Sequence, residues 1–600
     1  MPLDIAVQGP DDVVLRFAAE ELAAYVERIT GEQAGQRMHG SGSKIVLRLD
    51  PSIGTGDAVL LRSTDVGLIV ASPTTRGVLH GVYAYLESLG VRFPFPGADH
   101  EVVPRRDLVI DGYNRVEAPS FERRGMTFFG TGDDARGWID FCAKQRLNWV
   151  FLHSPDAAWW LRHRDALWPE LRKRGLTLEL GGHFLPQFLP RDLFAQHPNW
   201  FRVANGRRVN DYNLCPSSQP ALGYLKERVR QYVHEAPEAA VYNIWADDTA
   251  QNVSTWCSCE RCRRYSPSDQ NLLVMNALAE AVRDIQPAAR VVSIAYHETI
   301  VPPRTVTPGP GVVLMFAPRE RCYAHALDDP ACAKNRQHAA WLEEMLTTFD
   351  ASQAEVFEYY SDQYVFNDMA PALPDTISED LRYYKRLGIG LIEPLLVTFS
   401  HPWLAPPASA ILQSVAQRGV DTDLHAILAD HARTYYGHEG MVAYFERREE
   451  ALRRAVTVCD FTHPSAPFWT PPIEKPDVTV RYLQALEPAL ADLRAARGAL
   501  ARANSDAIGP SVGRCRDAER ALNLGGRRVN GLIHLARGIV AFDRFQDSKR
   551  REDAEEAIGC FEHAHADLNS IWLREEWGVR TFPLADLYIQ RTMRDLGEAR

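Results

Sequence analysis

The sequence predicts an α/β fold, namely a (β/α)8 TIM-like barrel between a small N-terminal α/β domain and a C-terminal helical domain. The first reason is the length of 600 residues, which suffices for several domains. The second is that about eight strand-like runs alternate with helical stretches in the middle of the chain. The third is that the last part shows helical periodicity alone. We expect the domains to cover residues 1–115, 120–430 and 435–600.

The first domain shows helices and strands in alternation. Apolar residues return every three or four positions over Arg16–Ile29 and Thr75–Leu89, which predicts two amphipathic helices. Gly90 follows the second helix and suits a left-handed helix end. Short apolar runs at Lys44–Leu49 and Gly67–Ala71 predict strands. Together these elements predict a small α/β layer without a catalytic constellation of its own.

The middle domain supplies the barrel strands. The eight candidates are Gly125–Gly130, Asn148–Ser154, Thr177–His183, Ala240–Asp248, Val291–Glu298, Val312–Pro318, Glu355–Tyr360 and Gly390–Phe399. A doubly wound sheet is the alternative, but the strand number and the length favour a barrel. Active sites of such barrels lie at the carboxyl ends of the strands, so polar residues there are the candidates for function.

The third domain is rich in Ala, Arg, Leu and Glu. Tyr482–Arg502 and Asp553–Leu573 show helical periodicity with alternating charge. We expect helices that pack on the barrel, and pairing of two chains through them as a homo-oligomer.

Charge and hydropathy exclude two classes of protein. The 67 Lys and Arg against 78 Asp and Glu give a net charge of −11, which argues against a nucleic-acid-binding protein. No apolar run reaches the roughly 20 residues of a membrane helix. The N-terminus lacks the layout of a signal peptide, so the sequence as given predicts a cytoplasmic protein. A secreted or periplasmic location follows instead if a leader was removed.

Two adjacent carboxylates, Asp247 and Asp248, follow the apolar strand that begins at Ala240. Successive side chains of a strand alternate in direction, so we expect one to face the barrel axis and the other a neighbouring strand or loop. Adjacent acids held close divide into acid and base roles. The alternative is one Asp that caps the following helix beside an exposed neighbour.

Other strand ends carry side chains suited to a polar ligand. Tyr296 and His297 could hydrogen-bond a ligand carbonyl and hydroxyl. Glu358 with Tyr360 could bind sugar hydroxyls beside a stacking ring, although a buried Tyr-rich strand with a paired Glu is equally consistent with the pattern.

Three further residues complete the expected substrate contacts. His183 follows two glycines, which permit close approach of backbone or ligand. Trp245 and Trp403 could form stacking walls, or could be ordinary core residues.

Cysteines gather just after the Asp pair. Cys257, Cys259 and Cys262 form a C-x-C-x-x-C pattern that could bind structural zinc, with Cys215 as fourth ligand. Buried reduced thiols and a disulfide are the alternatives. No HExxH, P-loop, GxGxxG or GxSxG motif is present, so we expect no cofactor that is required for catalysis.

Four stretches together resemble one family. They are HPNWFRVANGRRVNDYNLCPSSQPAL, WADDTAQNVSTWCSCERCRRYSPSDQN, IAYHETIVPP and EVFEYYSDQY. They are similar to the barrel catalogued as domain of unknown function 4838, part of which is classed as glycoside hydrolase family 163. TRGVLHGVYAYLESLGVRFPFPG resembles the small domain that precedes the barrel in α-glucuronidases and β-hexosaminidases.

The resemblance implies a glycoside hydrolase related to the β-N-acetylhexosaminidase barrels of families 20, 84 and 123. It implies retaining cleavage of terminal β-linked GalNAc or GlcNAc, in which the sugar's own 2-acetamido oxygen attacks the anomeric carbon. Asp248 would be the general acid and base, and Asp247 would accept the acetamido N–H. Tyr296 would donate to the acetamido carbonyl, and Glu358 and His183 would hold ring hydroxyls.

Three alternatives stay open at this point. One is an endo-β-N-acetylglucosaminidase on N-glycans. Another is an α-glucuronidase-like inverting hydrolase with separated carboxylates such as Asp248 and Glu358. The third is a carbohydrate-binding protein without catalysis. In all of them the expected partner is a carbohydrate, with no nucleic acid and no membrane.

Overall fold

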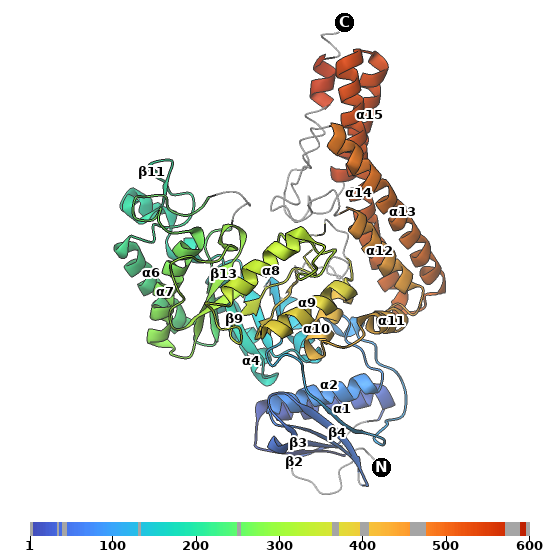
Figure 1. Cartoon of the computed structure of the whole chain (residues 1–600). Coiled ribbons are helices and arrows are strands. Elements are labelled where there is room, and N and C mark those ends of the chain that lie inside the picture. The colour runs from blue at the N-terminus through green and yellow to red at the C-terminus, as the bar shows by residue number, and fades with distance from the viewer. Residues whose placement is uncertain are drawn as a thin grey trace.

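The molecule has three parts that follow one another along the chain (Figure 1). The computed structural model describes residues 4–32, 35–38, 45–65, 67–129, 134–248, 254–362, 366, 371–396, 407–455, 476–569 and 589–595. A sheet with two helices comes first, a ring of strands surrounded by helices is in the middle, and a long helical bundle extends away from it.

The first part is a six-stranded sheet covered by two helices. The two predicted helices and the two predicted strands are among its elements. In chain order its strands are β1 (Asp4–Gln8), β2 (Gly35–Met38), β3 (Ile45–Leu49), β4 (Val59–Thr64), β5 (Gly67–Ser72) and β6 (Asn114–Glu117), paired in the order β2-β1-β3-β5-β4-β6. The helices are α1 (Val13–Thr30) and α2 (Thr75–Ser88). Asp12 caps α1 by accepting from two backbone N–H groups. Gly90, with φ of 94°, follows α2 in the expected left-handed conformation.

A nine-stranded sheet forms the centre of the molecule. Its strands, all paired in parallel, are β7 (Gly125–Phe129), β8 (Trp149–His153), β9 (Thr177–Gly182), β12 (Val241–Ile244), β13 (Arg290–Ala295), β14 (Val312–Phe316), β15 (Glu355–Val356), β16 (Leu391–Ile392) and β17 (Leu395–Leu396). Each of the eight predicted strand regions overlaps one of them, and the last region contains two. The strand predictions are therefore confirmed.

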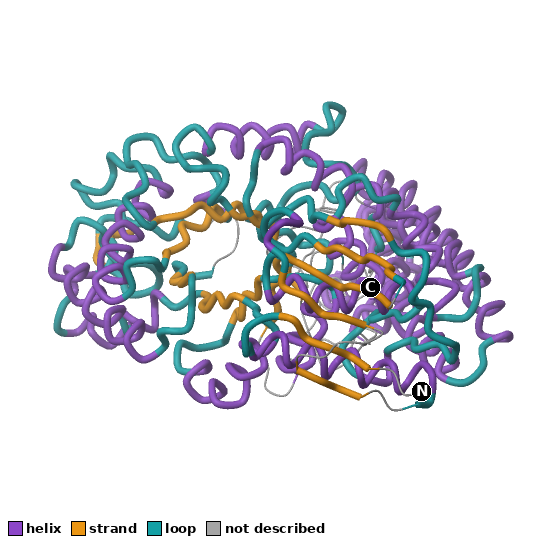
Figure 2. The backbone as a smooth tube through the Cα atoms, turned by 90° about the horizontal axis from the view of Figure 1, so that it is seen from below, coloured by secondary structure: helices purple, strands orange, loops and turns teal. Residues whose placement is uncertain are grey.

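The sheet curls into a barrel-like ring because its two edge strands are neighbours in sequence. Only Glu393 and Pro394 separate β16 from β17, and proline has no N–H to donate to a ladder. The backbone N–H of Glu393 donates to Val356 at 2.8 Å, which extends the pairing of β16 with β15. Thr127 of β7 donates to Pro394 at 3.0 Å. One interrupted strand thus joins both edges, and the ring is visible in Figure 2.

Helices follow the strands and lie outside the ring (Figure 2). They are α3 (Asp134–Lys144), α4 (Trp159–Lys173), α5 (Leu185–Phe188), α6 (Gln219–Glu235), α7 (Pro267–Ile285), α8 (Ala333–Met345) and α9 (Pro374–Leu387). This strand-to-helix order leaves the segments after the strands at one end of the ring, where the candidate site is found. A small hairpin, β10 (Val203–Ala204) with β11 (Arg207–Arg208), lies in the long segment between β9 and α6.

The described elements after β17 are helices. They are α10 (Pro407–Arg418), α11 (Leu424–Tyr435), α12 (Met441–Ala455), α13 (Pro476–Asp506), α14 (Pro510–Ser548) and α15 (Arg551–Asn569). The helices from α12 onward lie in the range predicted to be helical, whereas α10 and most of α11 lie in the range predicted for the barrel. Successive helices from α12 to α15 pack on one another and form the elongated bundle of Figure 1. Tyr482–Arg502 lies in α13, and the predicted helix from Asp553 follows α15 to its end at Asn569. The three domain boundaries stay predictions.

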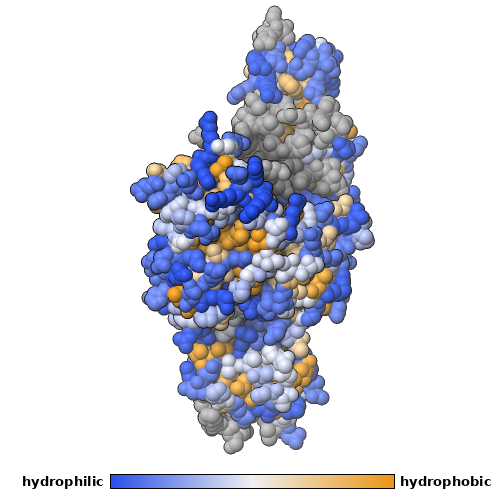
Figure 3. Space-filling view, turned by 60° about the vertical axis from the view of Figure 1, so that its left-hand side comes forward, coloured by the Kyte–Doolittle hydropathy of each residue, from blue (hydrophilic) through white to orange (hydrophobic). Residues whose placement is uncertain are grey.

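Hydrophilic residues cover most of the face in Figure 3, with small apolar areas between them. Large apolar side chains that are exposed, such as Val116, Ile508 and Met593, come from separate parts of the chain. Within the part of the chain that the structure describes, every helix is too short or too polar to span a bilayer.

Candidate active site

The two adjacent carboxylates follow β12 and have different surroundings. Asp247 has a side chain only 15% exposed, paired with Arg191, and its backbone N–H donates to Asn213 Oδ1 at 3.1 Å. Its Oδ2 is buried and has no hydrogen-bond partner among the residues that the structure describes. Asp248 is 60% exposed. One acid is therefore held in place while the other faces solvent.

A histidine and a second carboxylate stand beside Asp248. His297 follows β13 in a turn with φ of 51°, closed by Thr299, whose Oγ1 accepts from the backbone N–H of Tyr296 at 3.1 Å. Its Nε2 lies 3.8 Å from Asp248 Oδ1, and its Nδ1 lies 2.7 Å from Oε1 of the buried Glu320. The imidazole thus lies in a row between two carboxylates, and its distance to Asp248 is longer than that of a direct hydrogen bond.

Aromatic rings line the same end of the barrel. The ring centroids of His183 and Trp245 lie 5.2 Å apart, and those of His183 and Tyr296 lie 6.4 Å apart. His183 Nδ1 donates to the carbonyl of Ala246 at 2.6 Å, which leaves its Nε2 as the other polar atom. Trp245 is 3% exposed and its indole N–H donates to Asn243 Oδ1. Its ring therefore packs against the other aromatic rings and offers little surface to a ligand.

His153 joins this group, although its place at a predicted strand end led to no predicted role for it. It ends β8, and its ring lies 5.3 Å from that of Trp245 and 6.0 Å from that of His183. Burial, aided by the charge of His183, lowers the pKa of His153 to about 3, so its ring is neutral at ordinary pH. The sequence feature that points to His153 is its place at the end of the second predicted strand.

Arg319 was missed by the sequence reasoning. It lies buried after β14, with its Nε 3.8 Å from Asp362 Oδ2. Its pKa is raised because the nearby groups, chiefly Tyr296 and Asp362, outweigh burial, which acts in the opposite direction. Burial, with the charge of Asp248 added, raises the pKa of Tyr296 well above its usual value, so this phenol stays an O–H donor. Nη1 of Arg319 has no hydrogen-bond partner within the described residues. Its signal was the Arg-Glu pair directly after the sixth predicted strand.

Glu358 and Tyr360 lie elsewhere. Glu358 is fully buried, accepting from Arg321 at 2.8 Å and Tyr323 at 3.0 Å, and Tyr360 donates to Asp380 at 2.8 Å. Side chains alternate along a strand, and Phe357 instead contacts the ring of Trp245, 5.8 Å away. The structure therefore does not bring Glu358 and Tyr360 together with the Asp pair. Trp403 lies outside the described residues.

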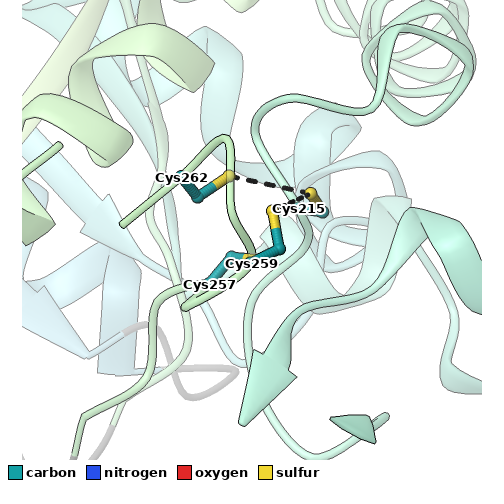
Figure 4. A group of neighbouring side chains, drawn as sticks. All are labelled: Cys215, Cys257, Cys259 and Cys262. Carbon is teal, nitrogen blue, oxygen red and sulfur yellow. Dashed lines mark hydrogen bonds between the residues drawn. The ribbon is translucent and has the colours of Figure 1, made fainter. Parts of the chain in front are cut away.

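The four cysteines do come together. Cys215 Sγ lies 3.7 Å from Cys262 Sγ and 3.8 Å from Cys259 Sγ, and Cys257 completes the group (Figure 4). Two separate segments of chain meet here, which the spacing of three cysteines alone did not determine.

Solved structures to which this chain is similar include glycoside hydrolases of several families. The GH138 enzyme that targets pectin rhamnogalacturonan II superposes with a TM-score of 0.60 and 11% identity, over 95% of this chain and 74% of the other. The GH115 4-O-methyl-α-glucuronidase with specificity for decorated arabinogalactans superposes with a TM-score of 0.58 and 13% identity, over 96% of this chain and 76% of the other. The N-acetyl-β-hexosaminidase of Streptomyces plicatus superposes with a TM-score of 0.48 and 14% identity, over 72% of this chain and 91% of the other.

No curated protein matches the sequence. The family model for the domain of unknown function DUF4838 matches residues 95–439. The match runs from the end of the first part through α11 and covers every barrel strand and both members of the Asp pair. It covers more than half of the 600 residues, so this chain belongs to the DUF4838 family.

Proposed function

We propose that the protein is a glycoside hydrolase that removes terminal β-linked N-acetylhexosamine by retaining, substrate-assisted catalysis. The observation that carries the proposal is the unequal Asp pair at the barrel mouth. Asp248 is exposed beside His297, whereas Asp247 is held by Arg191 with one buried oxygen lacking a partner in the described chain. Such a pair can divide the work between proton transfer and substrate positioning.

Asp248 is the general acid and base in this proposal. In the first step the 2-acetamido oxygen forms a bond to the anomeric carbon as the glycosidic bond breaks, and Asp248 gives its proton to the leaving oxygen. In the second step water forms a bond to the anomeric carbon and gives a proton back to Asp248, while the oxazolinium ring opens. His297, backed by Glu320, lies where it can stabilise the charge changes of Asp248.

Asp247 positions the acetamido group. Its free oxygen, Oδ2, can accept the acetamido N–H, which becomes more acidic as positive charge develops in the ring. Tyr296 keeps its proton and can donate to the acetamido oxygen before attack. His183 Nε2 is the remaining polar atom for a ring hydroxyl.

A uronic-acid-directed hydrolase is the second candidate, and Arg319 is the observation that favours it. A buried guanidinium whose Nη1 is unpaired in the described chain can donate a charge-assisted hydrogen bond to a sugar carboxylate. Endo-cleavage of N-glycans is a variant of the main proposal, because the same Asp pair would perform the reaction.

The test is hydrolysis of p-nitrophenyl β-GalNAc, β-GlcNAc and α-glucuronide in parallel with N-glycan release from a glycoprotein. We expect release from a β-N-acetylhexosaminide, retention of configuration by NMR, and inhibition by a thiazoline analogue. Glucuronide cleavage with inversion would support the second candidate and overturn the first. If none of these substrates is hydrolysed, both candidate functions are overturned.

Replacing each Asp by Ala separates their roles. Asp248→Ala should lower kcat/KM by about 10²–10⁴-fold on a substrate with a poor leaving group, and far less on a dinitrophenyl glycoside, which needs no acid. Asp247→Ala should lower kcat/KM equally on both substrates. Asp284→Asn, at a helical surface position with a side chain 54% exposed, is the matched control and should retain full activity. Equal loss on both substrates for Asp248→Ala would refute its role as the acid.

A further inference from the structure

We propose that Cys215, Cys257, Cys259 and Cys262 bind one structural zinc ion, and that this ion fixes the loops that support Asp247. The four ligand atoms lie within 4.8 Å of one another, and three of the four side chains are at most 2% exposed. A closed site with four thiolates and no open position is typical of structural zinc. The proposal does not depend on which sugar the enzyme cleaves.

The sulfur separations match tetrahedral zinc. Zinc–sulfur bonds of about 2.3 Å at tetrahedral angles place the sulfurs about 3.8 Å apart. Cys215 Sγ lies 3.7 Å from Cys262 Sγ and 3.8 Å from Cys259 Sγ, far beyond the roughly 2.0 Å of a disulfide bond. The side chains converge on one centre from both sides in Figure 4.

Polar groups around the sulfurs favour thiolates. The backbone N–H of Val203 donates to Cys257 Sγ at 3.3 Å, and Ser217 Oγ lies 3.1 Å from Cys262 Sγ. Arg208 lies beside the sulfur of Cys215. Four thiolates and Zn²⁺ carry a net charge of −2, which a neighbouring guanidinium and N–H donors stabilise.

Hydrogen bonds fix the backbone of the segments that carry the cysteines. Gln270 of α7 accepts from the N–H of Cys257 at 3.0 Å and donates to the carbonyl of Cys257 at 3.1 Å. The N–H of Cys262 donates to the carbonyl of Cys259 at 3.0 Å, which forms the tight turn between these two ligands. The carbonyl of Val203, in the hairpin, accepts from the N–H of Ser258 at 2.9 Å.

The cluster is linked to the Asp pair by short chain segments. Asn213, two residues before Cys215, accepts from the N–H of Asp247 at 3.1 Å. Its amide also donates to Thr255 at 3.1 Å, two residues before Cys257. Zinc therefore joins the two segments that carry Asn213 and Thr255, and its loss should loosen the support of Asp247.

The experiment measures metal content and thiols on the purified full-length protein. We expect about one zinc per chain by mass spectrometry, and ten thiols after denaturation without reductant. Cys257→Ser and Cys262→Ser should lose most of the zinc and melt at a lower temperature. Cys560→Ser, at a half-buried cysteine of α15 outside the cluster, should keep both.

Four results would overturn the proposal. They are zinc below about 0.1 per chain in the wild type, a thiol count lowered by a disulfide, iron in place of zinc, and a melting temperature unchanged by a strong zinc chelator. If one of the variants fails to fold, the wild-type protein can still be tested. Its thiols are titrated with a mercurial reagent, and a zinc-sensitive dye measures the zinc that the thiols release.

A separate measurement tests whether zinc fixes the segments that support Asp247. Hydrogen exchange of residues 201–218 and 254–263 should accelerate when zinc is removed, whereas exchange in α14 should not change. Unchanged exchange in both segments would overturn the supporting role. Because none of these measurements uses a substrate, zinc binding without glycosidase activity would refute the proposed function alone.

Discussion

The properties of single residues at the mouth of the barrel depend more on the groups around them than on the residue type. Asp247 and Asp248 are identical side chains in adjacent positions, yet one pairs with Arg191 in a nearly buried position and the other is 60% exposed beside His297. In the proposed reaction, these different surroundings suit Asp247 to hold a substrate group and Asp248 to exchange a proton.

His297→Gln tests the row of Asp248, His297 and Glu320. Glutamine keeps a hydrogen-bonding side chain but removes the titratable ring and leaves the buried Glu320 without its imidazole neighbour. We expect kcat/KM to fall by about 10-fold to 100-fold, less than on loss of the acid itself, with a displaced pH–rate profile on the best aryl glycoside. His234→Gln, at an exposed position of α6, should change neither quantity. A His297→Gln profile that superposes on that of the wild type would rule out this role.

At the scale of elements, the site depends on a close approach of β9 to β12. Gly181 has φ of 145°, and a Cβ there would lie 1.9 Å from the carbonyl oxygen of Asn243. The strand ends that carry His183 and Trp245 can therefore lie side by side only because residue 181 has no side chain.

Gly181→Ala should accordingly lower the free energy of unfolding by more than about 1 kcal/mol, because the methyl group clashes with backbone and the φ value is strained. Gly223→Ala, in α6 with open space around its Cβ, should raise stability by up to about 1 kcal/mol. Thermal and urea unfolding of both variants measure the difference. Equal stability of the two would contradict the close approach.

At the scale of the whole molecule, a buried ion cluster joins the first sheet to the barrel. Asp57, 4% exposed, accepts from Arg124 and from Asn148, both at 2.8 Å, and from Arg76 at 3.0 Å. Burial acts to raise the pKa of Asp57, but the neighbouring charges and hydrogen bonds, among them those of Arg76 and Arg124, outweigh it and hold this pKa below its usual value. These contacts connect residues 57–76 with the strands β7 and β8.

Asp57→Asn should cost about 3–5 kcal/mol at neutral pH, because two guanidinium groups lose their buried counter-ion. A carboxylate with a lowered folded pKa stabilises the fold above its unfolded pKa of about 3.9, and this contribution is lost as the pH falls through the folded value. The gap between wild type and variant should therefore narrow from pH 6 to pH 3 in thermal unfolding. Asp11→Asn, at an exposed ion pair, should show no such gap. A gap that is constant with pH would contradict this account.

Local patterns in the sequence determined the positions of the helices and strands, the place of the Asp pair and the candidate metal ligands. Hydrophobic periodicity depends on neighbours within a few residues, so the strand regions from Gly125 to Phe399 could be predicted individually. In a barrel, carboxyl ends of strands meet at one end, which brings His183, Tyr296 and His297 to Asp248 without further information.

The tertiary structure alone decided which face of a strand points inward and which charges pair. In β15 and the residues after it, both alternating sets, Val356-Glu358-Tyr360 and Glu355-Phe357-Tyr359, mix apolar and acidic residues, so hydrophobicity does not choose between them. Packing directs Phe357 to Trp245 and Glu358 to Arg321. The Arg191–Asp247 pair and the approach of Cys215 to Cys262 join residues more than forty positions apart, and such contacts arise only when distant segments fold together.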